Sequence, residues 1–204
     1  KYGVQDIRML KKLAIFLISN MASEYSFDKL KKVTGIENEE ILRLYMDSLE
    51  DSFLIYRVRK LNYIPDFEVE AIVPCKVYAG DTGFFKAVYP NYPNSLGLRF
   101  ENLVFLELLR QEKQIFYFQG LKECDFLLKD KGSEKVSAAI QVSVCLGNPV
   151  SREREISGLM EAMERYGLSE GLILTMDDEE ILEIEGSDGK KKIVVKPVWK
   201  WMLE

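Results

Sequence analysis

The stretch from residue 96 to residue 145 constrains the fold most, because it predicts one buried helix followed by three strands. Its first part is apolar at almost every turn, which is typical of a helix that packs in a core. Within this helix, Glu101 shares a face with Val104 and Leu108. A carboxylate in such a stripe is costly to bury unless a partner neutralises it, so we expect Glu101 to be paired.

The three strands that follow each carry apolar or aromatic residues, at 114–118, 123–129 and 137–144. Side chains alternate along a strand, so Gln141 and Ser143 point to one side of the third strand, while Asp125 projects from the second. Glu101, Asp125 and Gln141 therefore fall on consecutive elements of the chain. We expect their side chains to converge at one edge of a small sheet.

Helix and strand patterns alternate in the remainder of the chain. A helix capped by Ser151 is expected to run to Tyr166 and to end at Gly167. Three further strands are expected at 170–175, 180–185 and 191–195, and a short last segment opens at Pro197. This order predicts an α/β (α+β) domain with a mixed sheet flanked by helices.

The N-terminal part has a different order, three helices followed by a strand, which is typical of a winged helix-turn-helix. The helices are expected over residues 6–21, after Ser26, and after Asn38, and the strand over 53–58. An acidic, proline-containing segment at 65–70 suits a linker or a wing loop. We therefore divide the chain into a winged helix-turn-helix domain, residues 1–66, and an α/β domain, residues 72–204.

The third helix argues against DNA recognition by the winged helix. Over residues 39–51 it has five acidic residues and only Arg43 as a base, a net charge of −4 that DNA phosphates would repel. We expect residues 1–61 to bind duplex DNA no better than an acidic protein does. The basic residues Arg57, Arg59 and Lys60 on the wing either contact phosphate or form a solvated edge strand.

Composition excludes several classes of active site. The 204 residues include no histidine, which rules out Ser-His and Cys-His pairs and histidine metal sites. The net charge of −5 argues against a generally adhesive nucleic-acid binder. Cys75, Cys124 and Cys145 are scattered, and we expect reduced, buried thiols in a cytoplasmic protein with no membrane partner. Because the chain begins with Lys1, we also expect it to be a fragment.

Several motifs, taken together and in order, resemble a known family. They occupy residues 76–83, 100–108, 123–126, 140–143, 154–156 and 197–203. In this order the chain resembles the C-terminal region of archaeal and bacterial predicted ATPases of the AAA type, where a winged helix precedes a nuclease-like domain. The resemblance implies a PD-(D/E)XK nuclease fold and an ATPase domain upstream. The phosphate-binding motif GxxxxGK[ST] does not occur in this sequence, so ATP binding is expected only in the full-length protein.

The resemblance also implies a site. In active members of the fold, a helix glutamate, a strand aspartate and a Glu-x-Lys motif hold Mg²⁺ and orient a water. Glu101, Asp125 and Gln141 match the three acidic positions, whereas Ser143 stands at the lysine position. Asp125 and Gln141 are the expected metal ligands, but the glutamine removes one charge from the site. Arg154 either replaces the lysine or neutralises Glu101 or Asp125, and we expect the latter.

Three functional hypotheses follow. In the first, the chain is a non-catalytic accessory module that contains no cofactor and docks DNA, a protein partner or its own ATPase domain. In the second, it is a Mg²⁺-dependent DNA endonuclease whose catalytic cation has migrated. The third, transcriptional regulation through the winged helix, is weakened by the acidic third helix. Ser143 favours the first hypothesis over the second, because a serine supplies no cation for the scissile phosphate.

Overall fold

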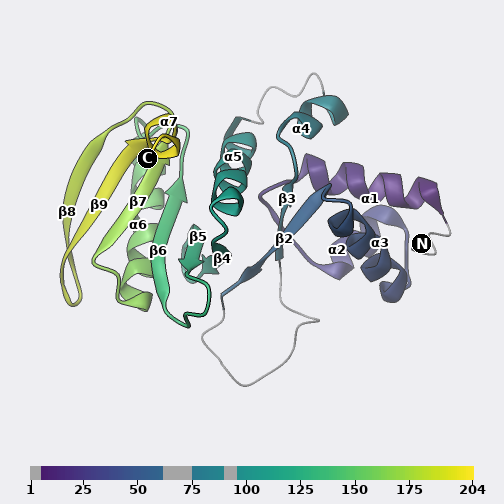
Figure 1. Ribbon diagram of the computed structural model, residues 1–204, viewed down its shortest axis with the longest axis horizontal. Coiled ribbons are helices and arrows are strands. Elements are labelled where there is room, and N and C mark those ends of the chain that lie inside the picture. Colours follow the sequence, from purple (N-terminus) through teal and green to yellow (C-terminus); the bar gives the residue numbers. More distant parts are fainter. Residues whose placement is uncertain (1–5, 62–74, 90–95) are drawn as a thin grey trace. The chain divides into compact units, whose positions relative to one another are not determined.

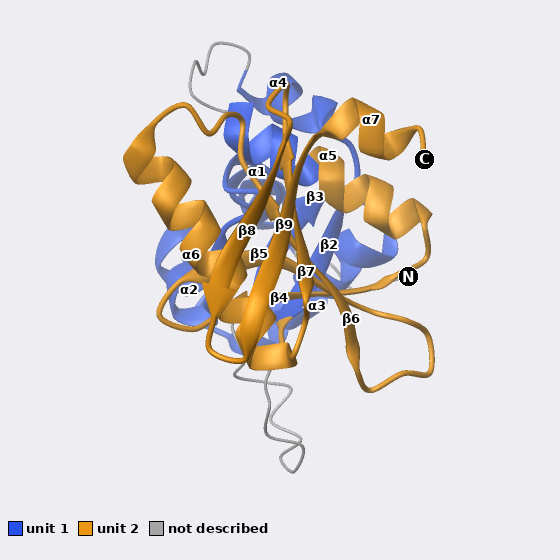
Figure 2. Ribbon diagram, turned by 90° about the vertical axis from the view of Figure 1, so that its left-hand side faces the viewer, with its two compact units in different colours: residues 1–59, 64–102 blue, residues 60–63, 103–204 orange. Residues whose placement is uncertain are grey.

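The computed structural model describes residues 6–61, 75–89 and 96–204. Across these residues the fold is mixed α/β, with seven helices and nine strands. The chain divides into two compact units, residues 1–59 with 64–102 (unit 1) and residues 60–63 with 103–204 (unit 2) (Figures 1 and 2). The predicted linker at 65–70 lies outside the described residues. None of the described helices is both long and apolar enough to span a membrane.

Unit 1 combines short helices with a small antiparallel sheet. Its elements are α1 (Ile7–Ser19), β1 (Glu24–Tyr25), α2 (Phe27–Thr34), α3 (Glu39–Asp51), β2 (Ile55–Lys60), β3 (Cys75–Ala79) and α4 (Gly83–Val88). The strands lie in the order β1-β3-β2, and β3 is antiparallel to both neighbours. Although β3 and α4 follow the predicted domain boundary, both belong to this unit.

Local capping chemistry determines where the helices of unit 1 begin. As expected, the Ser26 side chain accepts the Lys29 N–H at the start of α2, and Asn38 accepts the N–H groups of Glu40 and Ile41 at the start of α3. Gly35 ends α2 in the left-handed conformation. The apolar faces of these helices meet in one core, which includes Leu13, Leu17, Leu30, Leu42, Tyr45, Met46 and Ile55.

Helix α5 (Leu96–Arg110) belongs to unit 1 up to Asn102 and to unit 2 from Leu103. The remaining elements of unit 2 are β4 (Gln114–Gln119), β5 (Glu123–Lys129), β6 (Val136–Val142), α6 (Pro149–Tyr166), β7 (Glu170–Thr175), β8 (Glu180–Gly186), β9 (Gly189–Pro197) and α7 (Val198–Met202). Their strand order is β4-β5-β6-β7-β9-β8. The β6–β7 and β7–β9 pairs are parallel and the others antiparallel, which gives a mixed sheet.

Helix α6 covers one face of the unit 2 sheet, and α7 lies on the other face (Figure 2). The buried residues Leu159, Ala162 and Met163 of α6 share a core with residues of the strands, among them Leu127, Ile173, Ile193 and Val195. The predicted start of this helix at Ser151 is wrong. Asn148 is the cap, accepting the N–H groups of Val150 and Ser151, and Pro149 occupies the first turn, where its missing N–H has no cost.

The cysteines are only partly as expected. All three are free thiols, but Cys145 is exposed, Cys75 is half-buried, and only Cys124 is fully buried. Cys145 lies in the loop between β6 and α6, and connecting segments of this kind lie at the surface. An apolar sequence environment therefore did not predict burial at this position.

Candidate functional site

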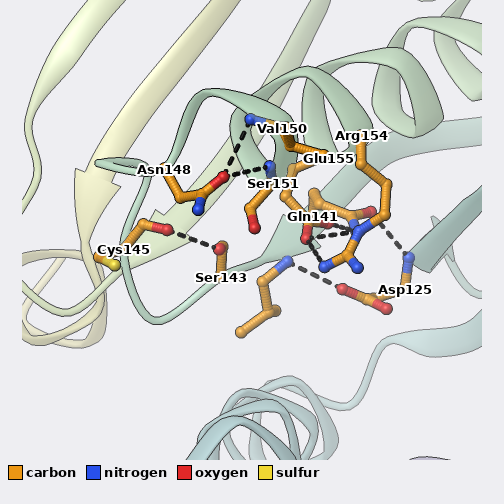
Figure 3. Close-up of polar contacts among 10 residues, drawn as sticks. Asp125, Gln141, Ser143, Cys145, Asn148, Val150, Ser151, Arg154 and Glu155 are labelled. Carbon is orange, nitrogen blue, oxygen red and sulfur yellow. Dashed lines mark hydrogen bonds and ion pairs between the residues drawn. The ribbon is translucent and has the colours of Figure 1, made fainter.

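Asp125, Gln141 and Glu155 form a buried polar cluster in unit 2 (Figure 3). Asp125 lies on β5 and Gln141 on β6, one residue beyond the paired Phe126 and Ile140, so the two side chains emerge next to each other. Glu155 projects from α6, the helix that covers this face of the sheet. Each of the three residues is only 5% exposed.

The side-chain amide of Gln141 bridges the other two residues. Its Oε1 accepts the backbone N–H of Asp125 at 3.2 Å, and its Nε2 donates to Glu155 Oε2 at 2.5 Å. The partners fix this orientation, because the Asp125 N–H can only donate and a carboxylate can only accept. The amide nitrogen of Gln141 therefore faces the carboxylate of Glu155.

The carboxylate of Asp125 is held by the backbone of the neighbouring strand. Its Oδ2 accepts the N–H of Val142 at 2.9 Å (Figure 3). This hydrogen bond satisfies a backbone donor at the end of β6 and fixes the aspartate rotamer. Asp125 thus has a structural role in this strand pair, whatever else it binds.

Arg154 forms an ion pair with Glu155, the acid that follows it directly in the sequence. Its Nη2 lies 2.5 Å and its Nε 3.2 Å from Glu155 Oε1, while 67% of its side chain is exposed. The hydrogen bond to Glu155 raises the pKa of Arg154, and the charges of Glu155 and Asp125 add to this effect. Of the two acids expected to pair with Arg154, Asp125 acts on it through its charge, and the direct ion pair with Glu155 was not expected because Glu155 was not recognised as a buried acid.

Ser143, at the position where the resemblance implies a lysine, uses its hydroxyl locally. The Oγ donates to the carbonyl oxygen of Cys145 at 3.1 Å in the loop after β6 (Figure 3). Such short side-chain to backbone hydrogen bonds are typical of serine in turns. Ser143 therefore orders a loop and supplies no positive charge.

Glu101 is paired, as its place on an apolar helix face requires, and its partners belong to unit 1. Glu101 Oε1 accepts from Lys76 Nζ at 2.9 Å and from the hydroxyl of Tyr78 at 2.7 Å. The Lys76 side chain is 2% exposed and that of Glu101 is 14% exposed. A lysine buried this deeply needs an ionised partner, and Glu101 provides one.

Sequence reasoning missed Glu155 and Lys76, although each carries a signal. Glu155 lies at helical spacing from Leu159 and Ala162, in the same kind of stripe that marked Glu101. Lys76 precedes Tyr78 by two residues, so strand alternation places both on one side. In both cases the signal is a charged residue among apolar positions.

Two acidic residues of α3 pair with one basic residue of the strand β2. Arg57 on β2 donates from Nε to Glu50 at 2.6 Å and from Nη2 to Asp47 at 2.8 Å, and its backbone N–H also reaches Glu50. Burial alone would lower the pKa of Arg57, but the hydrogen bond to Glu50 and the nearby acids hold it above its ordinary value. This arginine is engaged within the unit.

The described residues contain no group of three or more His, Cys, Asp or Glu side chains arranged to hold a metal ion. In comparisons with known proteins, the chain matches no family model, no curated protein and no solved structure. The resemblance to AAA-type ATPases consequently rests on the sequence motifs.

Proposed function

We propose that the chain is a non-catalytic docking module, a winged helix joined to a degenerate PD-(D/E)XK domain that belongs to a larger ATPase. One observation carries this proposal, the orientation of the Gln141 amide. Mg²⁺ prefers oxygen ligands, but the group that Gln141 turns towards Glu155 is an N–H donor. As arranged, Asp125, Gln141 and Glu155 do not fit a Mg²⁺ site, and we derive no catalytic step from them.

The contacts of the surrounding residues support the same proposal. Ser143 donates to a backbone carbonyl, Asp125 accepts a backbone N–H, and Arg154 neutralises Glu155. Each residue at or next to an expected catalytic position thus satisfies a neighbour in the fold. A buried polar network in which every member has a partner favours one packing arrangement, so these side chains have structural roles in the fold.

A second candidate function is a Mg²⁺-dependent DNA endonuclease, and Glu155 is the observation that favours it. Its carboxylate lies in the same cluster as Asp125 and restores the charge that Gln141 lacks. Arg154, which is mostly exposed next to it, would be the displaced cation. This candidate requires the Gln141 amide to turn, which would break both of its hydrogen bonds.

A cleavage assay separates the two candidates. The chain is incubated with supercoiled, single-stranded and branched DNA in the presence of Mg²⁺ or Mn²⁺, and we expect no cleavage above the buffer control. Loss of the catalytic cation alone costs about 10²-fold or more in rate. The variant Asp125→Ala, purified in parallel, controls for contaminating nuclease. Cleavage by the parent chain but not by this variant would refute the docking proposal, and Arg154→Gln would then test the cation.

A further inference from the structure

Basic residues are concentrated on the first two helices of unit 1. Together α1 and α2 contain six basic residues and one acidic residue, a net charge of +5, in a chain whose net charge is −5. The adjacent α3 has a net charge of −4. Unit 1 is therefore electrostatically divided, and its positive side is not the helix that a winged helix normally presents to DNA.

The positive charges on α1 form one exposed stripe. Arg8, Lys11, Lys12 and Ile15 follow the i, i+3, i+4, i+7 spacing of a single helix face, and the basic residues among them are exposed. The side chain of Arg8 is 94% exposed and lies 3.8 Å from Asp6, which caps the helix. In the described part of the chain, no ion pair engages Lys11 or Lys12.

Helix α2 extends this stripe. Lys12 Nζ donates to the carbonyl oxygen of Thr34 at the end of α2 at 3.4 Å. Lys29 of α2 is exposed, and its Nζ lies 5.9 Å from the ring centroid of Phe16 on α1. These contacts place the lysines of the two helices side by side. We call the resulting surface the α1 basic face, which comprises Ile7, Arg8, Lys11, Lys12, Ile15 and Lys29.

The composition of the face favours a protein partner over nucleic acid. Ile7 is 63% and Ile15 46% exposed, and such side chains match apolar groups rather than phosphates. Phosphate also binds at helix N-termini, but Asp6 caps α1 and Asp28 occupies the first turn of α2. These carboxylates would repel phosphate at the N-termini of both helices.

We propose that the α1 basic face docks an acidic amphipathic segment of a protein partner. Lys11 and Lys12 would pair with carboxylates of the segment, and Ile7 and Ile15 would contact its apolar side chains. Charge complementarity supplies the attraction and the apolar contacts supply the specificity. This inference rests on the proposed docking function, because it identifies the chemistry of the partner and the surface that binds it.

The test measures binding of fluorescent probes to the full chain at physiological salt. The first probe is a synthetic helical peptide with Glu and Leu at helical spacing, the second has every Leu replaced by Ser, and the third is duplex DNA. We expect the Glu/Leu peptide to bind more tightly than either other probe. Lys11→Glu with Lys12→Glu should weaken its binding by about tenfold or more. Ile15→Ser should weaken it by about tenfold, because an apolar contact is lost.

Lys135→Glu is the matched control, since Lys135 is exposed in unit 2, and binding should be unchanged. All variants change exposed side chains, and circular dichroism verifies that each is folded. Tighter binding of DNA, or no binding of any probe, overturns the proposal. So does equal binding by the Lys11→Glu, Lys12→Glu variant. DNA cleavage tests the separate question of whether unit 2 is catalytic, so the two failures are distinguishable.

Discussion

The amide of Gln141 meets a requirement that a carboxylate at the same position cannot meet. The site needs an acceptor for the Asp125 N–H and a donor for Glu155, and glutamine supplies both from one planar group. A glutamate would leave two carboxylates facing each other in a cluster that is 5% exposed. Gln141, which stands where the resemblance implies a catalytic glutamate, is therefore well suited to the fold.

We expect Gln141→Glu to destabilise the chain. At neutral pH the unmatched buried charge should lower the free energy of unfolding by about 3 kcal/mol. Repulsion raises the folded-state pKa of one of the two carboxyl groups above its unfolded value. The loss should therefore shrink as the pH falls through that folded-state pKa. Urea denaturation at several pH values measures both effects.

Gln114→Glu is the matched control, because Gln114 is exposed on β4, and it should change stability by less than about 0.5 kcal/mol. Mg²⁺ should restore part of the loss in Gln141→Glu and have no effect on the control, since the new carboxylate joins Asp125 and Glu155. Equal stability of Gln141→Glu and the parent chain would contradict the assignment of an N–H donor opposite Glu155.

The sequence predicted which side chains of the cluster lie next to each other better than it predicted which of them form hydrogen bonds. Strand alternation was sufficient to bring Asp125 and Gln141 next to each other, because β5 and β6 are consecutive and antiparallel. It could not show that α6 places Glu155 over them, since that depends on tertiary packing. The orientation of the Gln141 amide depends on this unseen partner, and so it could not be predicted either.

The close approach of α6 to β5 depends on one glycine. A Cβ atom at Gly158 would lie 2.1 Å from the backbone oxygen of Glu123, nearer than any side chain can be placed. One turn further along, Glu161 accepts the backbone N–H groups of Leu121 and Lys122 at 2.9 and 2.8 Å. The side chain of Glu161 on α6 therefore holds the backbone of the β4–β5 turn.

We expect Gly158→Ala to destabilise the chain by about 1–3 kcal/mol, because the helix must move away from the strand. Alanine favours the helix by about 1 kcal/mol over glycine, which is too little to offset the clash. Gly97→Ala in α5 is the control, since no atom lies within 4 Å of its added Cβ, and it should be neutral or stabilising. Thermal and urea unfolding measure both. A stabilised Gly158→Ala would show that the close approach of α6 is not required.

Elements with strong local signals were predicted well, and short elements were not. The starts of α2 and α3 follow from Ser26 and Asn38, whose side chains act within four residues. The two-residue β1 was missed because only its pairing with β3 makes it a strand. Helix α4 was not predicted, since its cap Thr82 makes no side-chain hydrogen bond.

Each unit has a core of its own, and one cysteine lies in or beside each core. Cys75 lies in β3 beside the core of unit 1, and Cys124 lies in β5 within the core of unit 2. The Cys124 thiol is fully buried and lies 3.5 Å from the carbonyl oxygen of Ile140. Cys145 is exposed outside both cores. The three thiols therefore differ in burial, from the exposed Cys145 through the half-buried Cys75 to the buried Cys124.

We expect iodoacetamide to modify the cysteines in the order Cys145, Cys75, Cys124. Cys145 needs no opening of the fold, whereas burial raises the pKa of Cys75 and so reduces its reactive thiolate. Cys124 should react only through unfolding of unit 2, and a stability of about 5 kcal/mol leaves an open fraction of about 10⁻⁴. Mass spectrometry of peptides over time gives the three rates, and in concentrated urea they should become equal. Reaction of Cys124 as fast as Cys75 in the native chain would mean that β5 opens locally and that the core of unit 2 does not protect it.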